Sequence, residues 1–388
     1  MHCRILRLHC PGCGLAHVQT ADKPAARPCV LFSRMALTAK TVFFGPKPTR
    51  RIQQICRVTT GQWDTEAVKK HIYIYSPSST VRDKASFKRG IKRLQILGHD
   101  VEIDEAALTK YQRFAGNDTT RLAAIHRAAA SGADIALISR GGYGLTRILA
   151  DINYNAMAKA IDHGTQFVGL SDFTALQLAI LAKTGAVTWA GPALGEDFGT
   201  TALPDDIMEA CFNDLITGQG EGTGWQLPKA KPLNAIDSIS KRPCQTCSSD
   251  DFIVKDATLW GGNLTVLISL VGTPYCPAIR GGVLLIEDVG EHPYRVERML
   301  TQLLHAGVLA QQKVIVFGQF SNYKLVPGYD SGFNLAGVAT WLQGQVKARV
   351  LTGLPFGHVA TKVLLPVGAT ITLAVEGRDA FLLWGHQH

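Results

Sequence analysis

Three residue types with complementary chemistry each stand where an apolar, strand-like run ends. Ser171 lies between a predicted strand and a predicted helix, Glu287 ends a second strand, and His358 follows a third on a turn rich in proline and glycine. A serine hydroxyl is a weak nucleophile until a histidine removes its proton, and that histidine needs a carboxylate to fix its tautomer. Open α/β sheets place their functional groups at such strand ends. Together the three residues indicate acyl-transfer or hydrolytic chemistry.

The segment around Ser171 has the sequence of a strand that turns sharply into a helix. Residues 168–170 are apolar or glycine, and the helical stretch begins directly at Phe173. This pattern is typical of a nucleophile elbow, in which a serine at the turn lies beside backbone N–H groups that can bind an oxyanion. The chain departs from the usual G-x-S-x-G pattern, because Phe173 stands where the second glycine is expected. An ordinary helix cap by Ser171 or Asp172 is the competing interpretation.

A second strand-to-helix turn spans residues 140–144 and carries three glycines. Glycines at such a turn allow backbone N–H groups to approach an anion closely, and Arg140 could hold a carboxylate. The G-x-G-x-x-G and G-K-[ST] patterns of nucleotide sites are absent, so phosphate binding is weakly supported. A purely structural tight turn is an equal alternative.

The carboxylates and the histidine also admit simpler roles. Glu287, Asp288 and Glu291 precede a predicted helix, where acidic side chains often serve only as partners for the helix N-terminus. A lone histidine such as His358 is more often a packing or surface residue than a catalytic one. The residue types alone therefore leave these assignments open.

Strand-like and helix-like segments alternate from residue 71 to 195, which predicts a parallel, doubly wound α/β layer. The expected fold class is α/β, with a flavodoxin-like N-terminal domain over 71–224. Residues 225–255 lack periodicity and are predicted to form a linker loop. Residues 256–388 are richer in strands and predict a mixed α/β C-terminal domain with a mixed or barrel-like sheet.

Periodicity and turn residues set the expected elements. Helices are expected at 84–97, 118–130, 145–149, 173–183, 264–270 and 294–306. Strands are expected at 72–75, 99–103, 133–139, 165–170, 187–190, 283–286, 314–317, 350–352, 362–365 and 370–375.

The excess of basic residues is confined to the start of the chain. The 388 residues carry 40 Lys and Arg against 31 Asp and Glu, a net charge of +9. Residues 1–70 hold 12 of the basic and 3 of the acidic side chains, which leaves 28 of each in the remainder. A basic protein ordinarily suggests nucleic acid or an anionic membrane as partner. The balanced remainder argues against nucleic acid, and no apolar run approaches the ~18 residues that span a bilayer.

Residues 1–70 also hold five of the nine cysteines and lack sustained periodicity, so they are predicted to be a poorly ordered N-terminal extension. Cys10 and Cys13 form a C-x-x-C pair, as do Cys244 and Cys247. This spacing is typical of half a zinc site. Nothing in the sequence shows that the two pairs meet, so a joined zinc site is weakly supported.

Several stretches, taken in order, resemble the serine-type L,D-carboxypeptidases that act on muropeptides, the muramoyltetrapeptide carboxypeptidases. The matching stretches are SRGGYG at 139–144, GLSDFTA at 169–175, LWGGNL at 259–264, EDVGEHPYRVERML at 287–300 and GLPFGH at 353–358. The resemblance covers about residues 71–388. It leaves out the N-terminal extension and the cysteine-bearing loop near 234–251.

The resemblance implies a catalytic triad in which Ser171 is the nucleophile, His358 the base and Glu287 the orienting carboxylate. Glu291 is the competing carboxylate. Glu287 is preferred because it occupies the first acidic position of the matching stretch.

The same resemblance implies further site residues around the triad. The backbone N–H groups of Asp172 and Gly142 are expected to form the oxyanion hole. Arg140 and Asn263 are the expected substrate-binding residues, and Arg140 would take the terminal carboxylate. No metal and no cofactor are expected.

Members of the resembled family remove the terminal D-Ala from a tetrapeptide of recycled or newly made peptidoglycan precursor. The scissile bond joins the L-centre of a diamino acid to D-Ala. The resemblance therefore implies a cytoplasmic hydrolase that acts on a small muropeptide and forms a homodimer, with no nucleic-acid or membrane partner. The sequence leaves open which diamino acid is preferred.

Two other functions compete with this hypothesis. A related amidase that cleaves a peptidyl-nucleotide antibiotic would keep the triad, but it would be expected to use an aromatic platform for the base. A non-catalytic binding protein would not need all three triad candidates. The match over 287–300 favours the muropeptide enzyme.

We expect removal of residues 1–70 to leave catalytic activity unchanged, because the resemblance and the balanced charge both begin after them. The check is to compare the rate of D-Ala release from a muramoyl tetrapeptide by the full and the shortened protein. A collapse of activity or of folding in the shortened protein would contradict the prediction.

Overall fold

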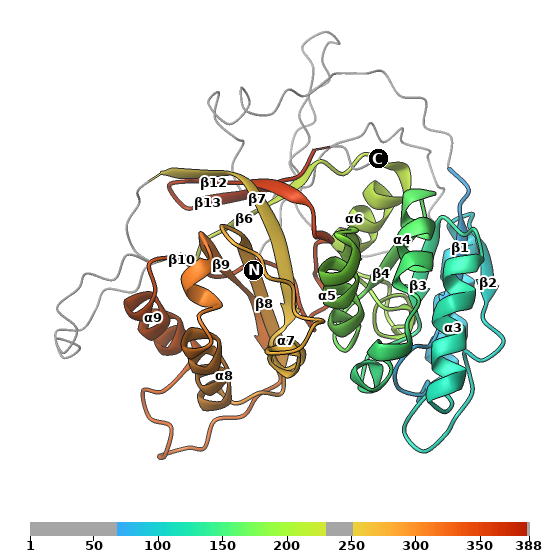
Figure 1. Cartoon of the computed structure of the whole chain (residues 1–388), viewed down its shortest axis with the longest axis horizontal. Helices are drawn as coiled ribbons and strands as arrows, with labels where there is room; N and C mark the ends of the chain where they lie inside the picture. The colour runs from blue at the N-terminus through green and yellow to red at the C-terminus, as the bar shows by residue number, and fades with distance from the viewer. Residues whose placement is uncertain (1–67, 230–250, 386–388) are drawn as a thin grey trace, which may run out of the picture.

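The computed structural model describes residues 68–229 and 251–385, which form two sheets with their covering helices (Figure 1). Residues 1–67 and 230–250 lie outside the described residues. The predictions for the N-terminal extension, for most of the linker, and for Cys10, Cys13, Cys244 and Cys247 therefore stay predictions. Across the described ranges, no helix combines the length and the apolar character needed to cross a membrane.

The first sheet has six strands in the order β11-β5-β4-β3-β1-β2. Strands β1 to β5 are parallel in the 2-1-3-4-5 order of flavodoxin-like folds, and β11 pairs antiparallel with β5. The predicted fold class is confirmed here. The strands are β1 (His71–Tyr75), β2 (Asp100–Ile103), β3 (Ile135–Ile138), β4 (Gln166–Gly169), β5 (Thr188–Ala190) and β11 (Leu365–Val367).

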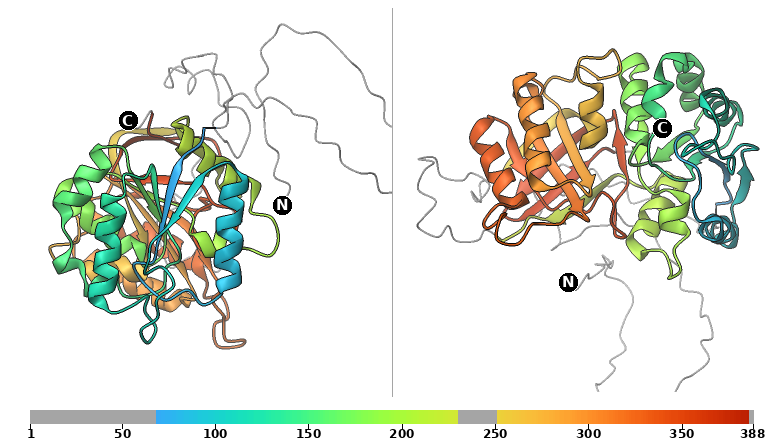
Figure 2. Two further views of the ribbon diagram at one scale, coloured as in Figure 1. Left: turned by 90° about the vertical axis from the view of Figure 1, so that its right-hand side faces the viewer. Right: turned by 90° about the horizontal axis from the view of Figure 1, so that it is seen from below.

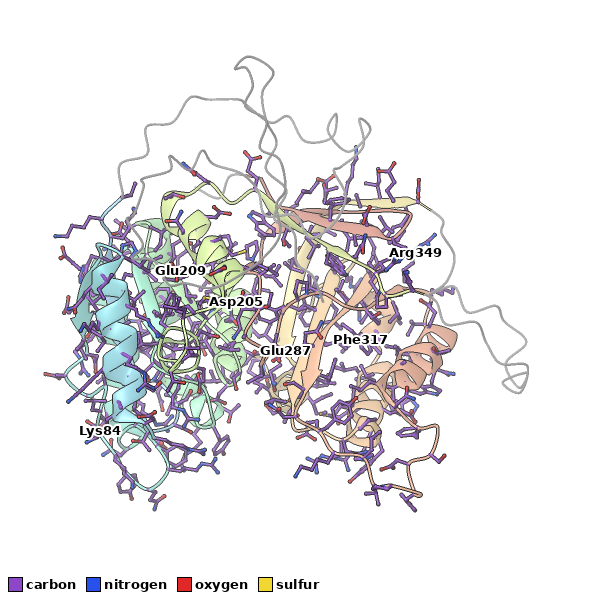
Figure 3. The ribbon with its side chains drawn as sticks, turned by 180° about the vertical axis from the view of Figure 1, so that it is seen from behind. Lys84, Asp205, Glu209, Glu287, Phe317 and Arg349 are labelled. Atoms are coloured by element: carbon purple, nitrogen blue, oxygen red, sulfur yellow. The ribbon has the colours of Figure 1, made fainter. Side chains whose placement is uncertain are left out.

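Helices cover both faces of the first sheet, as apolar parallel strands require. The face seen in Figure 1 is covered by α3 (Asp118–Ala130), α4 (Tyr154–Asp162) and α5 (Phe173–Thr184). The opposite face is covered by α2 (Lys84–Ile96), whose start is labelled in Figure 3. A π-helical turn at Leu194–Phe198 and α6 (Asp206–Thr217) follow β5.

Residues 145–149 do not form the expected helix. Two 3-10 turns, Leu145–Arg147 and Leu149–Asp151, are separated by Ile148 with φ −118° and ψ 3°. The apolar side chains of this segment are buried, and the N–H of Leu145 donates to the Asp172 carboxylate. Tertiary contacts thus override the local helical pattern.

The second sheet has seven strands in the order β10-β9-β8-β7-β12-β13-β6. Its first four strands are parallel and the other three are joined antiparallel, so the sheet is mixed, as predicted. The strands are β6 (Gly222–Gln226), β7 (Phe252–Asn263), β8 (Val283–Val289), β9 (Val314–Ser321), β10 (Arg349–Leu351), β12 (Thr370–Glu376) and β13 (Asp379–Leu383).

Three helices pack in a row along the parallel part of the second sheet (Figure 1). They are α7 (Leu264–Leu270), α8 (Pro293–His305) and α9 (Leu335–Gln345), with a 3-10 turn at Leu309–Gln311. Helix α9 is not among the expected elements, because two glycines weaken its helical pattern. Helices α4 and α6 are likewise absent from the predictions.

The two sheets exchange edge strands. Strand β6 precedes the expected linker but pairs with β13 in the second sheet, and β11 comes from the C-terminal part but pairs with β5 in the first. Strands also enter both ends of the predicted loop 225–255, because β6 ends at Gln226 and β7 begins at Phe252. The strand expected at 362–365 lies instead at β11, where Leu365 is its first residue.

We call the first sheet with its helices the first half of the molecule, and the second sheet with its helices the second half. The junction between the two halves is built around α5, which is buried along most of its length. It packs against α7 and β7, and Figure 2 shows the two halves side by side along this contact. Thr174 on α5 accepts a hydrogen bond from the backbone N–H of Asn263 at 3.1 Å. The carboxyl end of β4 and the carboxyl end of β7 therefore meet at the junction.

A buried ion pair also crosses the junction. Lys362 Nζ lies 2.6 Å from Asp197 Oδ1, and the two side chains are only 3% and 4% exposed. One residue earlier, the Thr361 hydroxyl donates to Asp205 Oδ2 at 2.6 Å, and Asp205 caps α6. The segment that precedes β11 is thus fixed to the first half by two polar contacts.

We expect Lys362→Met to lower the free energy of unfolding by about 3–5 kcal/mol, because it leaves the Asp197 carboxylate buried without its cation. The double variant Lys362→Met/Asp197→Asn should recover most of that loss, since neither charge is then present. Urea unfolding of the three proteins measures both effects. Equal stability of the wild type and the single variant would contradict the buried pair.

Candidate active site

Ser171 occupies a strained turn between β4 and α5. Its φ is +66°, in the left-handed region that a non-glycine residue adopts at a cost of about 1–2 kcal/mol. The cap position of α5 belongs to Asp172, and no side-chain hydrogen bond caps this helix. The competing interpretation, an ordinary serine or aspartate cap, therefore does not describe this turn. The geometry is that of a nucleophile elbow.

The glycine turn that follows β3 packs directly on Ser171. A Cβ placed on Gly141 would lie 2.6 Å from Ser171 Cβ and 2.9 Å from Ser171 Oγ, so a larger residue would collide with the serine. Gly142 has a φ of +115°, and a Cβ there would collide with the hydroxyl of Ser79. The two predicted turns are thus brought together, and Gly141 is needed for their close approach.

The Asp172 side chain is used inside the protein. Its carboxylate accepts hydrogen bonds from the Ser78 hydroxyl at 2.7 Å and from the N–H of Leu145 at 2.9 Å. Burial raises the pKa of this carboxyl, while both donors act in the opposite direction. Within the described residues, the backbone N–H groups of Asp172 and Gly142 have no hydrogen-bond partner. Free N–H groups of this kind are what an oxyanion hole requires.

Glu287 and His358 form the second pair that the structure brings together. Glu287 lies on β8, His358 follows β10, and His358 Nδ1 is 2.8 Å from Glu287 Oε2. The Glu287 side chain is only 1% exposed, whereas that of His358 is 21% exposed. Figure 3 shows Glu287 near the junction with the first half. A buried carboxylate thus holds a histidine that still reaches solvent.

Two glycines make room for Glu287. A Cβ on Gly357 would lie 3.0 Å from Glu287 Oε2 and 2.8 Å from the carbonyl oxygen of Gln319, and its φ is +137°. A Cβ on Gly318 would lie 3.2 Å from Glu287 Cβ. The glycine before the histidine in the predicted motif is therefore required by the packing around the carboxylate.

Asn263 lies behind Glu287 at the end of β7. Its Nδ2 donates to Glu287 Oε1 at 3.1 Å and to Asp288 Oδ1 at 3.0 Å. Its Oδ1 accepts the N–H of Val266 at 3.1 Å and caps α7. The side-chain amide that was predicted to bind substrate thus makes three hydrogen bonds within the protein.

Glu291, the competing carboxylate, contacts Arg295 one helical turn away and does not hold the histidine. His358 bonds to Glu287 instead. The structure therefore favours the carboxylate that the sequence comparison preferred.

Opposing effects act on the titration of His358. Burial lowers the pKa of the imidazole, but the hydrogen bond and the negative charge of Glu287 outweigh it and raise the pKa above the ordinary value of about 6.5. Lys362 lowers this pKa and Asp288 raises it. Glu287 therefore stabilises the protonated form of the ring.

Among the described residues, no hydrogen bond joins Ser171 Oγ to His358. Such bonds are often long before substrate binds. The Ser171 turn and the Glu287–His358 pair are connected through the Asn263–Thr174 hydrogen bond, which links the end of β7 to the start of α5. The site thus consists of an elbow from one half and a histidine–carboxylate pair from the other.

Arg140 and Glu196, a residue that the sequence patterns missed, are the remaining polar groups of the candidate site. Arg140 Nη1 donates to the carbonyl oxygen of Thr80 at 3.2 Å, and its Nε lies 3.6 Å from Glu196 Oε1. Glu196 sits on the π-helical turn after β5. The available signal was its place just after a strand, the same signal that marked Ser171 and Glu287.

Comparison with known proteins agrees with this architecture. Residues 72–191 match the model of the LD-carboxypeptidase N-terminal domain, and residues 256–373 match that of the LD-carboxypeptidase C-terminal domain. A putative carboxypeptidase of Synechocystis is 31% identical over 77% of this chain and 90% of its own. The chain belongs to the LD-carboxypeptidase family, and is accordingly a carboxypeptidase-type hydrolase.

Two further similar proteins have names that indicate different functions. A crystal structure of muramoyltetrapeptide carboxypeptidase from Oxalobacter formigenes is 37% identical with a TM-score of 0.69, and the match covers 81% of this chain and 98% of that one. The microcin C7 self-immunity protein of Escherichia coli is 26% identical over 62% of this chain and 70% of its own. Both kinds of protein are therefore similar to this chain.

We expect the Glu287→Gln substitution to lower the pKa of His358, because the amide removes the charge that raises it while burial still lowers it. Following the imidazole resonances by NMR over pH 4–9 measures this directly. The wild-type midpoint should lie above about 6.5, and the variant midpoint should lie below that of the wild type. Identical midpoints would contradict the electrostatic role of Glu287.

Proposed function

We propose that this protein is a serine-type L,D-carboxypeptidase that removes the terminal D-Ala from muropeptide tetrapeptides. The bond cleaved joins the L-centre of a diamino acid to D-Ala. The 2.8 Å contact between the buried Glu287 and His358 carries the proposal, because it supplies an oriented base on the half that packs against the Ser171 elbow. The similarity to the Oxalobacter enzyme supports the choice of substrate.

In the proposed reaction, Ser171 Oγ attacks the carbonyl carbon of the diamino acid while His358 Nε2 accepts the hydroxyl proton. The Nδ1–H of His358 donates to Glu287, which fixes the tautomer and stabilises the imidazolium. As the C–N bond breaks, His358 gives its proton to the amine of the leaving D-Ala. A water molecule then attacks the acyl-serine with the same base and restores the hydroxyl.

The proposed oxyanion hole consists of the N–H groups of Asp172 and Gly142. Both groups lie at turns that pack on the serine, and both have free donors among the described residues. The Asp172 carboxylate contributes by tying the elbow to Ser78 and Leu145, so the donor is fixed before the reaction. Preorganised donors of this kind are worth about 3–4 kcal/mol each in related chemistry.

Arg140 is the proposed partner of the substrate's terminal carboxylate. Its guanidinium carries five donors, and the two contacts described leave part of this fork for a ligand. Recognition of a free carboxylate would make the enzyme an exopeptidase. For Asn263 we propose support of Glu287 in place of direct substrate binding, because its amide is already engaged.

The proposal includes a role in peptidoglycan recycling, a cytoplasmic location and a homodimeric state. The family resemblance supports these three properties. Cleavage of a peptidyl-nucleotide, suggested by the similarity to the self-immunity protein, is the alternative that the experiment below separates.

We expect the intact protein to release D-Ala from a free or UDP-linked muramoyl tetrapeptide, as followed by mass spectrometry. Ser171→Ala should lower kcat/KM by about four orders of magnitude or more, because the nucleophile is lost. Ser269→Ala, which changes an exposed serine on α7, is the matched control and should be unaffected.

Two outcomes would reject the proposal. One is equal product from the Ser171→Ala variant and the wild type. The other is turnover of a peptidyl-nucleotide by the wild type without any release of D-Ala from the tetrapeptide.

A further inference from the structure

Glu196 lies at the same sheet edge as Ser171, one strand further along. It belongs to the π-helical turn that is separated from β5 by three residues, and β5 is the neighbour of β4. The preceding residue, Gly195, donates its N–H to the carbonyl oxygen of Ser139 at 2.9 Å. This contact places the turn of Glu196 against the start of the glycine turn that packs on Ser171. Such π-helical turns occur frequently at functional sites.

The Glu196 carboxylate forms an ion pair with Arg140 but accepts no hydrogen bond from it. Lys362, the nearby lysine, is held by Asp197 at 2.6 Å in a buried pair. The contact of Glu196 with Arg140 is 3.6 Å, which exceeds hydrogen-bond distance. The lone pairs of the carboxylate therefore stay available to another donor.

The Glu196 side chain is also accessible to solvent. Half of its side-chain surface reaches solvent, although the protein surrounds it closely enough that burial raises its pKa. The charges of Arg140 and His358 act in the opposite direction and lower it. The carboxylate thus stands within electrostatic reach of both the substrate-binding arginine and the base.

We propose that Glu196 determines substrate specificity by binding the side-chain ammonium of the diamino acid that precedes the scissile bond. This inference rests on the proposed function. In that substrate a carboxylate follows the scissile bond and an alkylammonium branches from the residue before it. The adjacent Arg140 and Glu196 present the complementary pair of charges at the edge that carries Ser171.

The competing role for Glu196 is structural, to hold Arg140 in place. In that case its removal would weaken every substrate with a terminal carboxylate equally. A direct contact with the ammonium would matter only for substrates that carry one. Comparing substrates with and without the ammonium group therefore distinguishes the two roles, whereas the variant tested on one substrate would not.

The test uses tetrapeptides that carry lysine or norleucine before D-Ala, since norleucine has the same carbon chain without the ammonium. For the wild type, we expect kcat/KM to be about 10- to 100-fold higher with lysine, as for a charge-assisted hydrogen bond. Glu196→Gln should remove most of this preference by lowering the lysine value, and should leave the norleucine value nearly unchanged.

Glu105→Gln is the matched control. Glu105 makes a similar exposed contact with an arginine, Arg127 at 3.1 Å, but it follows β2 at the far edge of the sheet. This variant should keep the wild-type preference for lysine. Melting temperatures of the three proteins should agree, which would exclude misfolding as the cause of any loss.

Three outcomes would overturn the inference. An equal rate of the wild type on both peptides would show that the ammonium is not recognised, while leaving the proposed function intact. Equal losses on both peptides in Glu196→Gln would assign Glu196 to Arg140 or to the base. No turnover of either peptide by the wild type would overturn the proposed function and this inference with it.

Discussion

The buried carboxylate of Glu287 imposes the strongest constraint on this molecule. A carboxylate that is only 1% exposed is tolerated only when hydrogen bonds satisfy its oxygens, and here one oxygen receives Asn263 and the other receives His358. Asn263 is fixed in turn by the start of α7. Gly318 within β9 and Gly357 in the turn before His358 leave the space that the carboxylate needs. The second half of the fold is thus organised around one charge.

The first half is organised around backbone strain. Ser171 holds a left-handed conformation, and the surrounding contacts must compensate for its cost. The buried Asp172 carboxylate, the glycine turn and the apolar helix α5 all fix this elbow. The two halves then meet where the backbone N–H of Asn263 donates to Thr174. This hydrogen bond links the strained turn to the residue that holds the buried carboxylate. Preorganisation on both sides is what acyl-transfer chemistry requires.

The sequence predicted the fold class because strand ends are visible as breaks in apolar runs, whereas the pairing of Glu287 with His358 was implied by the family resemblance. Ser171, Glu287 and His358 each carry that signal. The position of the Asn263 amide could not be predicted, because it depends on the register between β7 and β8. Glu196 and the Lys362–Asp197 pair lie in turns without periodicity, and their contacts join segments that are distant in the sequence. The helix expected at 145–149 was wrong because buried contacts and the Asp172 carboxylate outweighed local propensity.

The exchange of edge strands has a consequence for how the chain reaches its native state. Strand β11 pairs with β5 across nearly half of the sequence, and β6 pairs with β13, the last strand of the described chain. Neither sheet can therefore be completed while the chain is still being synthesised, because each waits for strands from the C-terminal region. Pairings so distant in sequence close slowly and expose unpaired strand edges in the meantime. The junction that carries the candidate site is therefore complete only when the C-terminal strands have joined both sheets.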